Sequence, residues 1–157
     1  MSTRAGGLPA YAIFAATLAA AGLPIYIHAP KYFVDEYGVS LAALGVILFG
    51  LRLLDVVQDP LLGWLSRRLG AWRRGSVAFA GAVMALAMVG LFAVEPPIAP
   101  AAWFAITLAL LFSAFSYLTI TFYAQGVQKA GTMRGRDGHV RLATWRESGA
   151  LLGVSMA

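Results

Sequence analysis

The fold is decided by residues 41–65, LAALGVILFGLRLLDVVQDPLLGWL. This stretch is long and apolar enough to cross a bilayer core of about 30 Å as a helix, which takes about 20 residues. It nevertheless carries Arg52, Asp55 and Asp59. Charged side chains are costly inside a bilayer, so an ionisable residue in a span marks a functional site by default. The stretch therefore predicts a membrane helix that takes part in ion-coupled transport.

The rest of the chain has the composition of a membrane protein. Of its 157 residues, 60% are hydrophobic and 12% are charged, which excludes a water-soluble domain. We expect four complete helices and the start of a fifth, at residues 8–29, 41–65, 76–94, 101–126 and 144–157. The sequence thus predicts an all-α membrane protein, and we expect residues 1–157 to be the front of a longer one.

A cleaved signal peptide is the competing interpretation of the N-terminus, because Arg4 precedes an apolar run. However, this run continues from Leu8 to Ala29, which is longer than the 7–15 apolar residues of a signal peptide. We therefore predict that it is the first retained helix.

The basic residues predict the orientation, because short loops rich in Lys and Arg stay in the cytoplasm. Two loops hold most of them: Arg67, Arg68, Arg73 and Arg74 in one, and Lys129, Arg134, Arg136 and Arg141 in the other. We therefore expect a multi-pass plasma-membrane protein, of a bacterial inner membrane, with a cytoplasmic N-terminus. The net charge of +5 follows from this topology, and we expect no nucleic-acid partner because the arginines are split between two loops.

Helix geometry places the three ionisable side chains of residues 41–65 on one face. At 100° per residue, Arg52, Asp55 and Asp59 fall at about 0°, 300° and 340°. The two aspartates are one turn apart, about 6 Å along the axis, so their oxygens can converge on one cation or share a proton. Two carboxylates this close in a low-dielectric setting do not both ionise without a counter-charge. We predict that they bind a cation on a face turned away from lipid.

A structural alternative is an ion pair between Arg52 and Asp55 that merely lets the helix enter the membrane. This pair accounts for Asp55 but leaves Asp59 without a partner. Pro60 has no amide proton, so it frees a carbonyl near position 56. Such a carbonyl can bind a cation, as in transporters with broken helices, or the proline can simply bend the helix.

The run RLLDVVQDPLLGW, residues 52–64, resembles a known family signature. It is similar to the second-helix motif of the glycoside-pentoside-hexuronide:cation symporters, the melibiose-permease-like branch of the major facilitator superfamily. YGVS at 37–40 and TWRES at 144–148 also resemble that branch. The specificity of the match lies in one string, formed by Asp55, Asp59, Pro60 and Gly63.

The resemblance implies a twelve-helix fold of two six-helix bundles, with residues 1–157 as the incomplete N-terminal bundle. It implies a secondary active transporter that couples a cation, H⁺ or Na⁺, to the symport of a sugar or a related small solute. Asp55 and Asp59 would bind the coupling cation, and the missing C-terminal bundle would be required for function. The positions implied for the substrate cavity are Tyr26, Arg52, Thr121 and Arg146.

The loop GWLSRRLG, residues 63–70, is similar to the cytoplasmic gating motif of the superfamily. The residues that match are Gly63, Arg67, Arg68 and Gly70, whereas Ser66 stands where the motif normally has an acid. The resemblance therefore implies a gating loop whose inward-side lock is weaker or is built from other residues.

Three further departures concern the solute and the ion. The acids that sugar-transporting members carry fall at Ala19 and Thr121, and a hydroxyl that assists sodium binding falls at Leu118. These changes weaken the case for a sugar and modestly favour a proton over sodium. A carrier of lysolipids or other amphiphiles in the same superfamily is therefore the main alternative.

A membrane-embedded enzyme is the alternative from a different class. CDP-alcohol phosphotransferases and intramembrane aspartyl proteases also use aspartates at membrane helices. The phosphotransferase pattern requires two further aspartates after a glycine on a second helix, and the proteases split their pair across two helices. The expected helices at 76–94, 101–126 and 144–157 contain no aspartate. We therefore expect no enzymatic activity, no cofactor and no metal beyond a possible Na⁺.

Overall fold

The computed structural model describes residues 7–132 and 138–157, and its regular structure within these ranges is entirely helical. Among these described residues, three helical stretches are long and apolar enough to cross a membrane: Leu8–Tyr37, Leu41–Phe92, which contains two helices, and Pro100–Gly131. The predicted all-α membrane fold is confirmed. Arg4, Arg134 and Arg136, which entered the sequence argument, lie outside the described residues.

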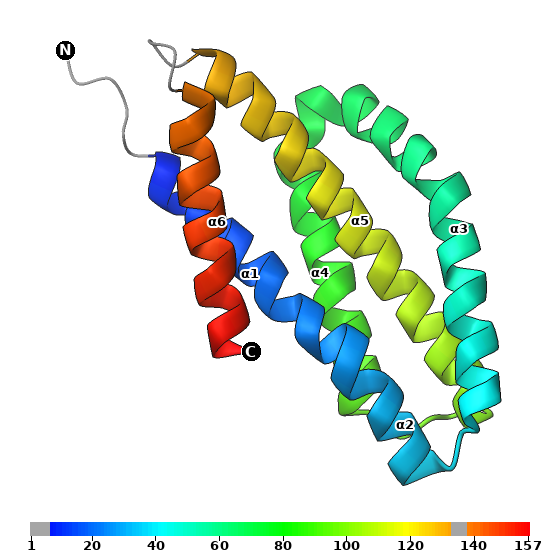
Figure 1. The fold of residues 1–157 in the computed structure, drawn as a ribbon. Coiled ribbons are helices and arrows are strands. Elements are labelled where there is room, and N and C mark those ends of the chain that lie inside the picture. The colour runs from blue at the N-terminus through cyan, green and yellow to red at the C-terminus, as the bar shows by residue number, and fades with distance from the viewer. Residues whose placement is uncertain (1–6, 133–137) are drawn as a thin grey trace. The chain divides into compact units, whose positions relative to one another are not determined.

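The described helices fall into two compact units. One unit comprises Met1–Ile27 and Tyr123–Ala157, and the other comprises His28–Phe122. We call them the terminal unit and the central unit. Helix α5, Pro100–Thr132, contributes to both (Figure 1).

The first apolar run forms more helix than the expected 8–29. Helix α1, Leu8–Leu23, leads into a π-helical turn at Pro24–His28 and then into α2, Ala29–Tyr37. An ion pair between Lys31 and Asp35, one turn apart, supports the added helix. The helix ends at Gly38, whose φ of 63° lies in the left-handed region that favours glycine.

The central unit contains a helical hairpin. Helix α3, Leu41–Arg68, turns through a 3₁₀ segment, Leu69–Trp72, into the antiparallel α4, Arg73–Phe92 (Figure 1). Ser40 caps the start of α3, since its hydroxyl accepts a hydrogen bond from the Ala43 amide at 3.1 Å. Helix α3 continues through Pro60 without interruption. The turn between the helices is thus shorter than the gap between the expected spans at 41–65 and 76–94.

Aromatic packing fills the core of the central unit near the end of α2. Phe33 of α2 and Phe104 of α5 are fully buried, with ring centroids 4.8 Å apart. The Trp103 indole donates a hydrogen bond of 2.8 Å to the Gly90 carbonyl of α4. These contacts join α2, α4 and α5 at one end of the unit.

The terminal unit is built on the close approach of α1 and α6, Gly138–Met156. A Cβ added to Gly149 would overlap the Ala12 carbonyl, and one added to Gly153 would overlap the Ala16 carbonyl. Small residues four apart on both helices let the two backbones touch, as in many membrane helix pairs. Other glycines inside apolar helices were also candidates for close helix contact. Among the described residues, a Cβ added to Gly90 would lie 3.4 Å from the Thr107 side chain of α5, whereas nothing lies within 4 Å of a Cβ at Gly45, Gly50 or Gly81.

Candidate functional site

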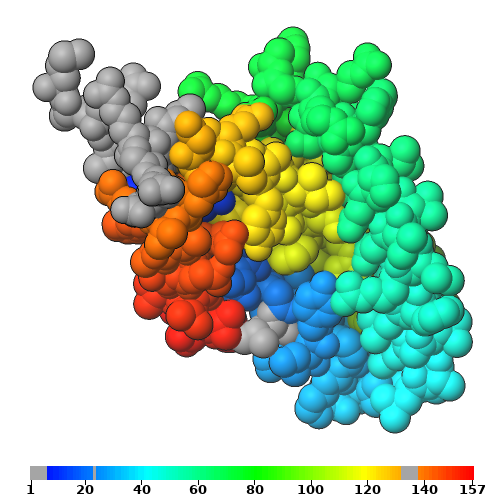
Figure 2. Space-filling model, turned by 45° about the horizontal axis from the view of Figure 1, so that its top comes forward, coloured from blue at the N-terminus to red at the C-terminus, as the bar shows by residue number. Residues whose placement is uncertain are grey.

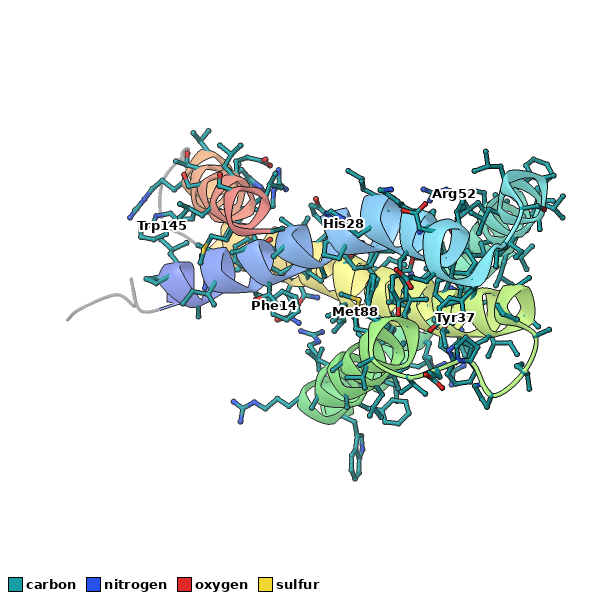
Figure 3. All side chains as sticks on the ribbon, turned by 90° about the horizontal axis from the view of Figure 1, so that it is seen from below. Phe14, His28, Tyr37, Arg52, Met88 and Trp145 are labelled. Carbon is teal, nitrogen blue, oxygen red and sulfur yellow. The ribbon has the colours of Figure 1, made fainter. Side chains whose placement is uncertain are left out.

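Asp55 lies on α3 and forms an ion pair with Arg52. The Arg52 Nη1 atom is 3.4 Å from Asp55 Oδ2, and the two side chains are 61% and 17% exposed. The Arg52 guanidinium also lies 5.8 Å from the ring centroid of Phe112 on α5. Arg52, labelled in Figure 3, therefore connects the mostly buried Asp55 carboxylate to the Phe112 ring of the neighbouring helix α5.

Asp59 is placed differently from Asp55. Its residue is exposed, and it makes no ion pair within the part of the chain that the structure describes. The apolar side chains of Val56 and Val57, between the two aspartates, are exposed as well. The Arg52–Asp55 pair of the structural alternative is therefore present, and it accounts for one carboxylate of the two.

Helix α5 offers a stripe of three hydroxyls to the α3–α4 hairpin. Ser113 bonds to Gln58 at 2.8 Å, Tyr117 donates to Ser76 at 2.7 Å, and Ser66 and Thr121 share a bond of 2.9 Å. We call Ser113, Tyr117 and Thr121 the hydroxyl stripe. Its members are four residues apart, so they lie on one face of α5 and contact two helices.

The first member of the stripe fixes a polar side chain beside the aspartates. The Ser113 hydroxyl has one proton and lies 2.7 Å from the Ala109 carbonyl as well as 2.8 Å from Gln58 Oε1. The Gln58 Nε2 atom is buried and has no partner among the described residues. Rotating the amide by 180° lets Nε2 donate to Ser113 while Ser113 donates to Ala109, and Oε1 then takes the buried position.

Thr121, predicted for the substrate cavity, is 2% exposed and bonds to Ser66, which is 7% exposed. Ser66 is the position at which the resembling gating loops have an acid. In this conformation both hydroxyls lie in a helix contact of the central unit. The role of Thr121 as a solute ligand stays a prediction.

The remaining residues of the predicted gating loop lie at the surface. Arg67 and Arg68 are exposed, and the Arg68 guanidinium is 5.0 Å from the Trp64 ring centroid. A Cβ at Gly63 would come no closer than 4.0 Å to the Arg67 side chain, and one at Gly70 would meet nothing within 4 Å. Neither glycine is therefore required by close packing among the described residues.

The other two cavity candidates belong to the terminal unit. Tyr26 lies in the π-helical turn with its side chain partly exposed. Arg146 of α6 donates from Nε to the Glu147 carboxylate at 2.8 Å, and its guanidinium lies 5.1 Å from the ring centroid of Tyr123. Its neighbour Trp145, labelled in Figure 3, is also on α6. Arg146 is thus held between an acid and an aromatic ring.

Several polar contacts were missed by the sequence analysis. They involve Gln58, Ser76, Ser113 and Tyr123. The four-residue spacing of Ser113, Tyr117 and Thr121 inside an apolar helix was a signal that could have revealed the hydroxyl stripe. Within the described ranges, no group of three or more His, Cys, Asp or Glu residues has the arrangement of a metal site.

A bundle of apolar helices with two acids inside a candidate span defines a class, the polytopic membrane proteins. A comparison with known families gives the particular one. The family described as MFS/sugar transport protein matches residues 8–157, so the chain belongs to that family of the major facilitator superfamily. This match supports a membrane transporter rather than an enzyme. No solved structure matches the chain.

Proposed function

We propose that the chain is part of a cation:solute symporter in which Asp55 and Asp59 bind the coupling cation together. The observation that supports this most is the contrast between the two carboxylates. Asp55 pairs with Arg52, whereas Asp59, one turn further along α3, has no ion-pair partner among the described residues. A carboxylate in a membrane span is stabilised by protonation, by a bound cation or by water. Asp59 is therefore a candidate to bind a proton or a cation.

We propose that Asp55 and Asp59 bind one cation or proton together. One guanidinium cannot neutralise both, so binding of a cation or proton supplies the missing charge and lets Arg52 and Asp55 rearrange. The occupied and empty states then differ in the charge on the α3 face, which biases the side on which the cavity opens. Leu118 is buried and its side chain offers no oxygen, a feature that favours H⁺ over Na⁺.

We propose a small organic solute, a sugar or a related compound, as the cargo. Arg146 is the candidate that recognises it, because its guanidinium is already oriented by Tyr123 and Glu147. Tyr26 and Arg52 are the further candidates. The coupling cation and a lipid bilayer complete the set of partners.

A carrier of lysolipids or other amphiphiles is the second candidate function. It is favoured by Thr121, whose hydroxyl bonds to Ser66 and is not available to a sugar in this conformation. Protection of the purified protein from thermal unfolding distinguishes the two. Cation-dependent protection by members of a sugar panel supports the first function, and protection by lysolipids alone supports the second.

We further propose that residues 1–157 form the incomplete first bundle of a twelve-helix transporter. Such transporters rock one bundle against the other around a central site, so function requires both. We propose a bacterial inner membrane with the N-terminus in the cytoplasm. The basic residues at 67–74 and 129–141 then lie on the cytoplasmic side.

Transport by the full-length protein in proteoliposomes tests the coupling role. With an imposed H⁺ or Na⁺ gradient, Asp59→Asn should abolish accumulation of the solute while solute exchange without a gradient continues. Asp35→Asn is the matched control, since Asp35 pairs with Lys31 away from α3. Gradient-driven accumulation by Asp59→Asn at the wild-type level would refute the proposal.

A further inference from the structure

The turn between α3 and α4 carries positive charge and no acid. Residues 60–94 contain four arginines and neither Asp nor Glu. The nearest preceding acid, Asp59, is eight helical residues before Arg67, about 12 Å along the axis. Within the described residues, the side chains of Arg67, Arg68 and Arg74 make no ion pair. These three charges are therefore not compensated by a neighbouring carboxylate.

The polar side chain at position 66 does not offset this charge. Ser66 is buried and neutral, and its hydroxyl is engaged with Thr121. Arg67, Arg68 and Arg74 are exposed on the outside of the same turn. Figure 2 shows this part of the central unit at the surface, in green at the top. The hydrogen bond inside and the charges outside thus divide the turn into a neutral inner side and a cationic outer side.

Two tryptophans accompany these arginines. Trp64 lies under the Arg68 guanidinium at 5.0 Å, and Trp72 is 77% exposed. Tryptophan is enriched at the level of the lipid head groups, because its ring is apolar and its N–H is polar. An exposed indole does not help to bind an ion from water, but it is stabilised at the level of the lipid head groups. The exposed Trp72 therefore favours a site at a membrane surface.

We propose that this turn binds the head groups of anionic phospholipids through Arg67, Arg68 and Arg74, with Trp72 in the interfacial layer. Arginine suits a phosphate because its planar guanidinium can donate two parallel hydrogen bonds. The α3–α4 turn then holds the ends of both helices at the membrane surface. The inference depends on the proposed membrane topology, but it does not depend on the coupling role of Asp55 and Asp59.

Lipid binding to the full-length protein, measured by native mass spectrometry in detergent, tests this site. We expect phosphatidylglycerol to bind more tightly than phosphatidylcholine. Each basic residue near an anionic surface contributes about 1 kcal/mol, which is about fivefold in affinity. Arg68→Gln should therefore weaken phosphatidylglycerol binding about fivefold, whereas Lys31→Gln, on α2 and paired with Asp35, should have little effect.

Gly70 offers a variant that tests the charge without disturbing packing. Nothing lies within 4 Å of a Cβ at this position, so both an aspartate and an asparagine fit. Gly70→Asp should weaken phosphatidylglycerol binding severalfold, whereas Gly70→Asn, of nearly the same shape, should not. Equal binding by these two variants would overturn the proposal. So would equal affinity for the two lipids, an equal effect of Lys31→Gln, or displacement of the lipid by an equal concentration of inorganic phosphate.

Discussion

Ser66 of α3 and Thr121 of α5 share a hydrogen bond of 2.9 Å in the interior of the central unit. Loops that resemble residues 63–70 normally have an acid at the position of Ser66. Here a neutral hydroxyl pair connects the two helices. A neutral pair needs no counter-charge, so this connection is expected to depend little on salt.

We predict that Ser66 and Thr121 stabilise the protein jointly. Interhelical hydrogen bonds in membrane proteins contribute about 0.6 kcal/mol on average and at most about 1.7 kcal/mol. Ser66→Ala and Thr121→Val should each lower the free energy of unfolding, and the double variant should lose less than the sum. A double-mutant cycle in mild detergent measures this coupling. Additive losses would show that the two hydroxyls act independently.

The packing of α1 on α6 leads to a second prediction. Gly149→Ala places a methyl group against the Ala12 backbone, and relieving this overlap should cost about 1–3 kcal/mol. Gly45→Ala is the matched control, because nothing lies within 4 Å of its Cβ and alanine favours a helix. Thermal unfolding should therefore occur at a lower temperature in Gly149→Ala than in Gly45→Ala. Equal unfolding temperatures would contradict close packing at Gly149.

Much of the fold could be predicted from the sequence because the bilayer imposes helix length and apolar composition. The starts of α1 and α3 were predicted at the observed residues, Leu8 and Leu41. The helix ends were less predictable. Helix α2 extends to Tyr37 although Lys31, Asp35 and Glu36 interrupt the apolar run, and a hydropathy profile does not predict that the helix continues through charged residues.

The candidate site was predictable only in part. Spacing alone placed Asp55 next to Arg52, and the structure has that ion pair. Spacing did not reveal that Gln58 bonds to Ser113, since a contact between helices depends on how they rotate against each other. For the same reason sequence position does not distinguish Gly149, which lies against the Ala12 backbone, from Gly45, which has nothing within 4 Å of an added Cβ.

A third prediction concerns Arg146. Its guanidinium is held by Glu147 and Tyr123, so its position is already ordered for binding a solute. Arg146→Ala should weaken solute binding by the full-length protein tenfold or more, as expected for about 1.4 kcal/mol, while cation binding changes little. Calorimetric titration with solute and with cation measures both. An equal loss of the two affinities would indicate a structural role for Arg146.

The fourth prediction addresses the central claim, that Asp55 and Asp59 bind one cation together. The most direct measurement is cation binding by the purified full-length protein, followed as proton uptake or as Na⁺ uptake. We expect wild type and Asp35→Asn to bind one coupling cation, and both Asp55→Asn and Asp59→Asn to lose it. Retention of wild-type cation binding by either of the last two variants would contradict a shared site.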